Sequence, residues 1–426
     1  MARYDSEIAA IARPLAGDAD LDPLLDRIGG ARVVMIGEAS HGTHEFYRWR
    51  DTLTRRLITE HGFDFVAVEG DWPDCDRVDR SVRLRPGAAV DPRAALEQFV
   101  RWPTWMWANE EVAGFCRWLV QANRTAPHPA GFHGLDVYSL WESLREILAH
   151  LREHDPDQVP AALAAYRCFE PYGEDPQTYG WATRFVSASC ETEVVNLLVR
   201  LREQASDFGV WQNAEVVAGA EHYYRAMVHG GSRSWNIRDR HMDETLSRLL
   251  DEYTKTRGRE SRGVVWAHNT HVGDARGTDQ ARHGEVTIGE LARDRYGAQN
   301  VVLVGMGGHR GTVIAGESWG APHAEMPVPP AREGSLEDHL HEAAPPRALI
   351  LVPPYRDRPD VLVDELPHRA IGVVYRPERE RWANYVPTVL GDRYDAFLWF
   401  DETRAVRPMD TRAVDVLEPE TYPTGV

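Results

Sequence analysis

Short runs of β-branched and other apolar residues recur along the chain at wide intervals, and segments with helical periodicity separate them. The sequence predicts strands over residues 31–36, 63–68, 130–135, 263–267, 301–304, 311–315, 348–352, 370–375 and 396–399. Strands that alternate with helices are typical of a parallel sheet covered by helices. We therefore expect an α/β protein with a mostly parallel central sheet flanked by helices.

Strand signals disappear between Pro156 and Lys255. Segments in this region place apolar residues three and four positions apart, which predicts amphipathic helices. We interpret residues 155–257 as a large all-helical insertion that forms one wall of a cleft. Residues 1–154 and 258–426 then form the α/β catalytic core. The proline-rich stretch 322–330 is expected to be a loop or a boundary, because proline lacks the N–H that a helix or a central strand requires.

Ionisable side chains follow four of the expected strands at the point where each strand ends: Glu38 and His41, then Glu69, then Asp136, and finally His268 and His271. In an open parallel sheet the carboxyl ends of all strands lie along one edge, and ligands bind in the crevice beyond that edge. One polar residue after a strand carries little information, but four such endings rich in His, Glu and Asp indicate a site. We therefore expect these side chains to converge.

His41 and its acidic neighbours suit proton transfer. Histidine is the usual proton shuttle near neutral pH, and a carboxylate within hydrogen-bond reach fixes its tautomer and raises its basicity. Glu38 and Glu69 provide that combination.

Residues 45–50 are expected to begin a helix beside the same edge of the sheet. Arg50 on this helix would either reach a developing negative charge or form a surface ion pair with Glu45 or Asp51. His44 and His61 are expected to have no chemical role.

Two glycine motifs are interpreted as structural. Residues 316–320, GESWG, fit the GxSxG pattern of serine hydrolases, but prolines follow where the nucleophile elbow needs a helix, so Ser318 is not predicted to be a nucleophile. Residues 305–308, GMGG, begin like a dinucleotide-binding loop, yet Arg310 stands where the third glycine is needed.

A metal centre is a serious alternative. His41 and His44, and likewise His268 and His271, are spaced three apart, and Glu38, Glu69 and Asp136 would complete a set of ligands that activates water. The HxxH spacing differs from HExxH on a helix and is weakly specific in a loop. We therefore expect a site without metal or cofactor and keep the metal-dependent hydrolase as the alternative.

Three indoles, Trp102, Trp105 and Trp107, fall within one short segment. A buried corner of the core is one explanation. The other is a lid or apolar wall for a large apolar substrate, because clustered indoles offer a wide apolar surface with a polar edge. Trp105 and Trp107 are therefore candidate substrate-binding residues.

The composition of the chain excludes several classes of protein and of partner. Of 426 residues, 43% are hydrophobic and 27% are charged, which excludes a disordered or fibrous chain. The net charge of −18 repels phosphate backbones and anionic lipid, so we expect neither nucleic acid nor a membrane as a partner. Lys255 is the only lysine, which effectively excludes lysine chemistry.

The four cysteines, Cys75, Cys116, Cys168 and Cys190, lie far apart and form no CxxC pair. This spacing favours reduced thiols that pack in the interior. The N-terminal residues lack a basic region followed by an apolar run, and no apolar stretch is long enough to span a bilayer. We expect a cytoplasmic protein that acts on a small molecule.

Four segments in order along the chain carry a resemblance to a known family. They are VMIGEASHG at 34–42, FVAVE at 65–69, WNIRD at 235–239 and VWAHNTH at 265–271. Together they resemble the erythromycin esterase family over about residues 30 to 310, and the match is looser beyond.

The resemblance implies an α/β core with a helical insertion and hydrolysis of an ester without metal, in the best-known members the macrolactone of erythromycin, an activity that confers antibiotic resistance. The family's water-activating histidine falls on His41 and its glutamate on Glu38. Its further glutamate, arginine and second histidine fall on Glu69, Arg50 and His268. The central block, residues 156–231, shows no pattern that matches macrolide specificity, so the substrate does not transfer. The family also includes members labelled as polysaccharide-biosynthesis proteins.

The resulting hypothesis is a metal-independent hydrolase of a carboxylic ester or macrolactone. His41 removes a proton from water, Glu38 and Glu69 orient the base and the water, and Arg50 and His268 stabilise the oxyanion without a covalent intermediate. Three further residues are expected to support the site or bind substrate: Asp136, His271 and Arg238. A non-catalytic binding protein or polysaccharide-biosynthesis accessory protein is the third class considered.

Overall fold

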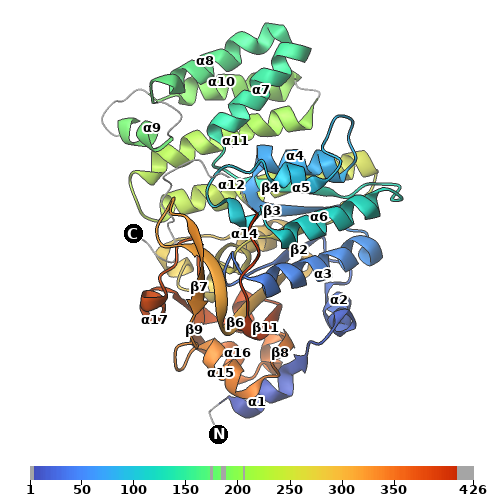
Figure 1. The fold of residues 1–426 in the computed structure, drawn as a ribbon, viewed down its shortest axis with the longest axis vertical. Helices are drawn as coiled ribbons and strands as arrows, with labels where there is room; N and C mark the ends of the chain where they lie inside the picture. Colours follow the sequence, from blue (N-terminus) through green and yellow to red (C-terminus); the bar gives the residue numbers. More distant parts are fainter. Residues whose placement is uncertain (1–3, 173–175, 184–188, 205–206, 410–426) are drawn as a thin grey trace.

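The computed structural model describes residues 4–172, 176–183, 189–204 and 207–409. Within them a nine-stranded sheet has the order β1-β8-β11-β6-β2-β5-β3-β4, with β7 paired to β6 (Figure 1). The strands are β1 Ala12–Pro14, β2 Val33–Ile36, β3 Phe65–Asp71, β4 Gly131–Asp136, β5 Gly263–Trp266, β6 Val301–Gly316, β7 His323–Val328, β8 Arg347–Leu351 and β11 Ala396–Thr403. A separate two-stranded sheet pairs β9 Glu365–Arg369 with β10 Tyr385–Val389.

Neighbouring strands from β11 to β4 are parallel, and β1, β7 and β8 are antiparallel additions. The expected α/β fold with a mostly parallel sheet is therefore confirmed. The predicted runs at 31–36, 63–68, 130–135, 263–267, 301–304, 348–352 and 396–399 fall on β2, β3, β4, β5, β6, β8 and β11.

Helices surround the sheet (Figure 1). They are α1 Asp5–Ile11, α2 Asp22–Ile28, α3 His44–His61, α4 Trp72–Val82, α5 Pro92–Leu96, α6 Glu110–Asn123, α7 Leu140–His154, α8 Val159–Phe169, α9 Pro176–Thr183, α10 Glu191–Gln204, α11 Phe208–Met227, α12 Ser232–Arg257, α13 Asn269–Val272, α14 Ile288–Tyr296, α15 Leu336–Ala343, α16 Asp360–Val363, α17 Glu380–Ala383 and α18 Leu390–Arg393. Among the described residues, none of these helices has both the length and the apolar character that crossing a membrane requires.

Each face of the sheet packs against its own apolar cluster, because successive side chains of a strand point to opposite faces. Val34 and Ile36 of β2 join one cluster with α3 and α6. Val33 and Met35 of the same strand join the other with α12 and α14. Burial on both faces explains why the central strands are continuous apolar runs.

A third apolar cluster lies within a group of helices beyond the β4 edge of the sheet, at the top of Figure 1. It runs from Val137 to Tyr224 and therefore includes α7, which the sequence assigned to the core. The long helix α12, by contrast, packs Met242 and Leu246 against the sheet. The third cluster thus joins α7 to helices of the expected insertion, and the boundaries 155–257 of that insertion stay a prediction.

Residues 311–315 lie in a strand, as predicted, but they continue β6, which runs without a break to Gly316. Two other expectations were wrong. Residues 370–375 form only isolated bridges, at Ile371 and Val374. The proline-rich stretch 322–330 contains β7, an antiparallel strand on β6. An edge strand bonds on one side alone, so it tolerates the prolines that a central strand would exclude.

The prediction of four reduced thiols was also wrong. Cys168 at the end of α8 and Cys190 before α10 form a disulfide, with their Cα atoms 5.8 Å apart. Cys75 and Cys116 are free and buried, as expected. Helix α8 packs against α10, and this packing brings together two cysteines that are 22 residues apart in the sequence.

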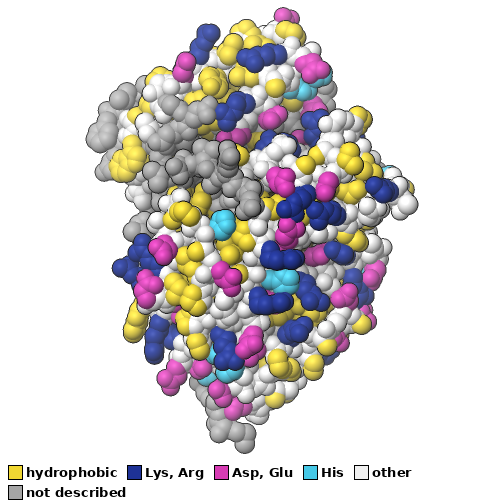
Figure 2. Space-filling view, in the orientation of Figure 1, with side chains coloured by type: hydrophobic (Ala, Val, Ile, Leu, Met, Phe, Trp, Pro, Cys, Tyr) yellow, Lys and Arg dark blue, Asp and Glu magenta, His cyan; other side chains and the backbone are white. Residues whose placement is uncertain are grey.

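Charged side chains of both signs are interspersed over the face shown in Figure 2. The net negative charge of the chain does not gather there into one acidic field.

Candidate active site

One pocket opens at the carboxyl ends of the central parallel strands and encloses about 840 Å³, part of it open to solvent. Its lining includes His41 from the loop after β2, Glu69 and Asp136 from the carboxyl ends of β3 and β4, His268 from the loop after β5, and His271 from α13. Arg238 reaches the same pocket from α12. The structure therefore brings together side chains that lie far apart in the sequence, as the geometry of a parallel sheet predicts.

His41 sits on a tight loop between β2 and α3. A Cβ on the next residue, Gly42, would collide with the backbone of Ile314, so only glycine allows this close approach. His41 Nδ1 lies 2.8 Å from Glu38 Oε1, and both side chains are buried. The loop thus holds the imidazole against a carboxylate at the rim of the pocket.

Arg50 lies behind this pair and not in the pocket. Its Nη1 is 2.7 Å from Glu38 Oε2, its Nε donates to Ile36 O, and Nη2 donates to Ala267 O at 2.5 Å. The side chain is fully buried on α3. Both sequence interpretations of Arg50, an oxyanion contact and a surface ion pair, are therefore corrected: the guanidinium holds Glu38 and ties together the ends of β2 and β5.

His268 presents one ring nitrogen without a partner. Nδ1 lies 2.8 Å from Thr270 Oγ1 and accepts a hydrogen bond from the Thr270 N–H at 3.3 Å, whereas the buried Nε2 makes no hydrogen bond to the described residues. Burial, with His41 adding to it and Glu69 opposing it, holds the pKa of His268 well below its usual value. The ring is therefore neutral, and its proton lies on Nε2.

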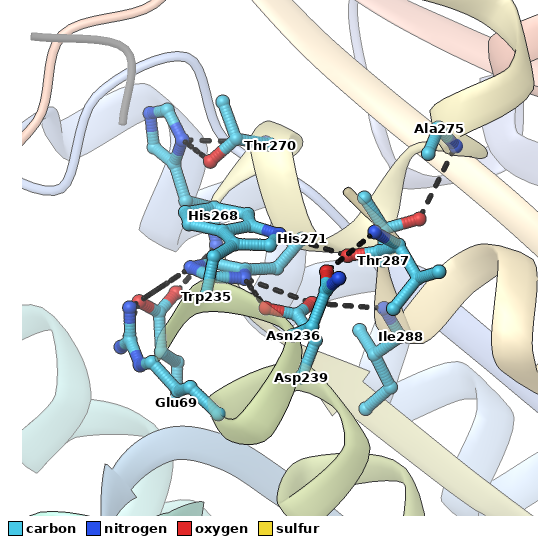
Figure 3. Close-up of polar contacts among 12 residues, drawn as sticks. Glu69, Trp235, Asn236, Asp239, His268, Thr270, His271, Ala275, Thr287 and Ile288 are labelled. Carbon is cyan, nitrogen blue, oxygen red and sulfur yellow. Dashed lines mark hydrogen bonds and ion pairs between the residues drawn. The ribbon is translucent and has the colours of Figure 1, made fainter. Parts of the chain in front are cut away.

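Glu69 is held from three sides (Figure 3). Its Oε2 accepts from the His268 N–H at 2.8 Å, and its Oε1 accepts from Arg238 Nη2 at 2.7 Å. His271 Nε2 is 3.4 Å from the same Oε1. Burial by itself raises the pKa of Glu69, but His271, Arg238, His41 and the His268 N–H lower it by more. The carboxyl is thus ionised at neutral pH.

Arg238 and His271, which also line the pocket, continue this network. Arg238 also binds both oxygens of Asp136, at 3.0 and 2.7 Å, and its Nη1 is 3.0 Å from His271 Nε2. The His271 ring stacks on Trp235 with centroids 4.3 Å apart, and its Nδ1 is 2.9 Å from Asp239 Oδ2 (Figure 3). Asp239 is fully buried and also accepts from the Ile288 N–H. Sequence reasoning gave no role to Asp239, although it ends the WNIRD segment.

The three tryptophans of residues 102–107 have different surroundings. Trp107 lines the pocket and donates to Glu69 O at 2.8 Å. Trp102 also lines it and packs against Trp319, with ring centroids 4.6 Å apart. Trp105 is fully buried in the core and does not line the pocket, so its proposed substrate contact is corrected. Trp319 belongs to the GESWG turn, which leads from β6 into β7 rather than into a helix.

Sequence reasoning missed three charged residues of the pocket lining, Asp71, Asp74 and Arg101. The available signal was that polar residues continue after Glu69, as EGDWPD. Arg101 comes from a loop remote in sequence, and no local pattern pairs it with Asp71.

The residues present do not fit the metal alternative. His44 lies at the start of α3 and directs Nδ1 to Glu111 Oε1 at 2.8 Å, so it does not join His41. Within the described ranges, no three His, Cys, Asp or Glu side chains are arranged to hold a metal ion.

A mostly parallel sheet with a buried histidine–carboxylate pair at its carboxyl edge defines an α/β enzyme. The erythromycin esterase family model matches residues 58–403, and the chain belongs to that family. Membership supports hydrolase activity.

The chain is also similar to individual proteins and solved structures. The chain is 30% identical to erythromycin esterase type II of Escherichia coli over 118 residues, which is 28% of this chain and only 26% of that protein. A succinoglycan biosynthesis protein of known structure has a TM-score of 0.78 at 19% identity and covers 94% of this chain and 97% of its own. A mutant of erythromycin esterase EreC in its open conformation has a TM-score of 0.67 at 16% identity and covers 93% and 96%. These structures share the fold.

Proposed function

We propose that this protein hydrolyses a carboxylic ester or lactone with water activated by His41 and without a covalent intermediate. The observation that carries the proposal is the buried chain Arg50–Glu38–His41, which ends at the pocket. Glu38 accepts the Nδ1–H of His41, which leaves Nε2 as the basic atom. A general base in this position removes a proton from water as the water oxygen attacks the ester carbonyl.

His268 supplies the donor for the developing oxyanion. Its ring is neutral. The Ala39 carbonyl acts on its pKa, but the Nε2–H makes no hydrogen bond of normal geometry to the described residues, so a substrate oxygen can accept from it. A donor fixed before the reaction stabilises the charge of the tetrahedral intermediate without reorganisation. Arg50 takes no part in this contact and acts through Glu38.

Glu69 orients the attacking water. It stays ionised beside His41 because Arg238 and the His268 N–H hold it. When the tetrahedral intermediate collapses, the bond from carbon to the alcohol oxygen breaks. His41 then returns its proton to the leaving alkoxide, so the cycle needs no further proton donor.

The substrate class follows from the pocket and the family. The indoles of Trp102, Trp107 and Trp319 form apolar walls around the polar site, which suits an ester with a sizeable apolar part. Macrolactones, erythromycin among them, are the first candidates because of the family to which the chain belongs.

His41→Ala tests the proposal, with His44→Ala as the matched control on the same loop and helix. Macrolides and simple esters are incubated with each protein, and mass spectrometry measures the gain of one water. Loss of the base should slow hydrolysis by about 10²- to 10⁴-fold, while His44→Ala keeps the wild-type rate. A His41→Ala protein that folds and hydrolyses within about threefold of wild type refutes the assignment. Saturable ligand stabilisation with no turnover of any ester would instead favour a binding protein.

A further inference from the structure

Asn269 is the one residue between the two pocket residues His268 and Thr270, and the proposed reaction does not use it. Its side chain is fully buried and is not part of the pocket lining. It begins the short helix α13 after β5, whereas His41 follows the neighbouring strand β2. A buried amide must find partners for its donors and its acceptor, and those partners show what it holds in place.

The main chain of Asn269 joins the loops that carry the two catalytic histidines. Its N–H donates to the main-chain carbonyl of Glu38 at 2.8 Å, and its own carbonyl accepts from Arg393 Nη2 at 3.0 Å. Glu38 holds His41, and His268 directly precedes Asn269. The rings of His41 and His268 lie with their centroids 4.9 Å apart. The base and the oxyanion donor of the proposed reaction are thus connected through one residue.

The side chain of Asn269 reaches a third strand. The sheet has the local order β6-β2-β5, so the amide crosses the end of β2 to contact β6. Nδ2 donates to Met306 O at 2.7 Å and lies 3.4 Å from His368 Nε2, while Oδ1 accepts from the Met306 N–H at 3.3 Å. His368 directs Nδ1 to Glu337 Oε1, which leaves Nε2 as an acceptor. Both donors and the acceptor of the amide therefore have partners.

Gly37 leaves the space through which this amide passes. It follows β2 directly, and a Cβ at this position would collide with Asn269 Oδ1. The backbone of Gly37 does not have the positive φ that favours glycine, so the requirement is for space and not for conformation. A methyl group here would push the amide away from β6 without removing any hydrogen-bonding group.

We propose that Asn269 is a positioning residue that sets the spacing of His41 and His268, and that Gly37 is required because the amide passes over it. The consequence for catalysis rests on the proposed function. The water activated by His41 and the oxyanion bound by His268 belong to one ester carbonyl, so the two rings must keep one separation. A shift of about 1 Å in a catalytic group can lower the rate roughly 10²-fold.

Nuclear magnetic resonance measures the spacing without any turnover. Full-length protein with protonated histidines in a deuterated background should show a nuclear Overhauser effect between the rings of His41 and His268, whose centroids are 4.9 Å apart. Single His41→Ala and His268→Ala variants assign this histidine signal. Asn269→Ala should abolish it, because the loop that carries His268 is then no longer held to β6.

Asn123→Ala is the matched control. Asn123 on α6 is buried, donates from Nδ2 to Val82 O and Ala130 O, and accepts from the Ala130 N–H. Its amide makes as many hydrogen bonds as that of Asn269, but its partner Ala130 precedes the amino end of β4, and it does not line the pocket. Both variants should lose stability in urea, whereas only Asn269→Ala should change the histidine signal and kcat.

Kinetics on the best ester test the consequence for catalysis. Asn269→Ala should lower kcat by about 10- to 100-fold with KM within about threefold of wild type, because the pocket lining keeps its residues. Gly37→Ala should also lower kcat, since the added Cβ displaces the amide. The double variant should be within about twofold of Asn269→Ala, because no amide is left to displace, whereas independent effects would multiply.

The proposal is overturned if the wild-type protein lacks the histidine signal, if folded Asn269→Ala protein keeps it, or if Asn123→Ala loses it as well. Loss of the signal with kcat within about twofold of wild type also overturns it, as do effects of the two substitutions that multiply. If Asn269→Ala does not fold, Gly37→Ala decides, because an unchanged signal in that variant refutes the role of the amide. A wild-type protein that hydrolyses no ester, with the histidine signal as expected in every variant, would refute only the proposed function.

Discussion

Arg50 and Glu38 form a fully buried ion pair, with Arg50 Nη1 2.7 Å from Glu38 Oε2. The other oxygen of Glu38 holds His41. Because Arg50 also donates to the carbonyl of Ile36 at the end of β2 and to that of Ala267 just after β5, the position of His41 is tied to the sheet itself. In the proposed mechanism Arg50 is therefore a positioning residue, because it acts on His41 through Glu38.

Arg50→Met should lower both stability and activity. Removal of one partner leaves Glu38 buried without its counter-charge, and such losses cost about 3–5 kcal/mol. Urea unfolding measures the stability change. In the folded fraction we expect kcat to fall, because Glu38 loses the contact that holds it against His41. Arg48→Met, at an exposed position on the same helix, is the control and should change the free energy of unfolding by less than about 0.5 kcal/mol.

His268→Ala should lower kcat about 10²- to 10³-fold with little change in KM, as expected when one oxyanion donor is removed. In the proposed mode of binding the substrate contacts mainly the apolar walls, which this change leaves in place. Steady-state kinetics on the best ester provide the measurement. A KM that rises while kcat is preserved would show that His268 binds substrate rather than stabilising the transition state.

Asp239→Asn should slow the reaction although Asp239 does not line the pocket. The aspartate holds His271, which meets Arg238, which in turn binds Glu69. Loss of the charge weakens this series of contacts. Misplacement of a catalytic group by about 1 Å can lower the reaction rate roughly 10²-fold. Asp243→Asn lies one turn further along α12 and binds Arg295, so it serves as the control. Equal kinetics in the two variants would remove Asp239 from the proposed network.

Glu69 should contribute a pH-dependent part of the stability. Its pKa in the folded protein is lowered, so the ionised carboxylate stabilises the fold above the unfolded-state pKa of about 4.3. That stability is lost as the pH falls from there through the lower pKa of the folded state. Unfolding of wild type and Glu69→Gln is compared at pH 7 and pH 3.5. The advantage of wild type should shrink at the lower pH; an advantage that grows on acidification would contradict the lowered pKa.

Strand positions were readable from the sequence where both faces of a strand are buried. The runs that became β2 and β5 are continuous and apolar, and an ionisable residue, Glu38 or His268, stands two positions after each of them. The proline-rich segment 322–330 was predicted to be a loop or a boundary, but it contains the edge strand β7. An edge strand pairs on one side only, so it tolerates proline. The disulfide was missed for a similar reason: Cys168 and Cys190 meet through the packing of α8 and α10.

The sequence by itself determined the α/β class and the chemistry available at the strand ends, because burial imposes an apolar period on each strand and the topology of a parallel sheet sends its carboxyl ends to one edge. Only the tertiary structure decided the direction of each side chain. It put Arg50 behind Glu38, buried Trp105, and brought Arg101 to Asp71 across thirty positions of the chain. These outcomes depend on contacts between residues distant in sequence, and a local pattern carries no information about which distant side chain will neutralise a buried charge.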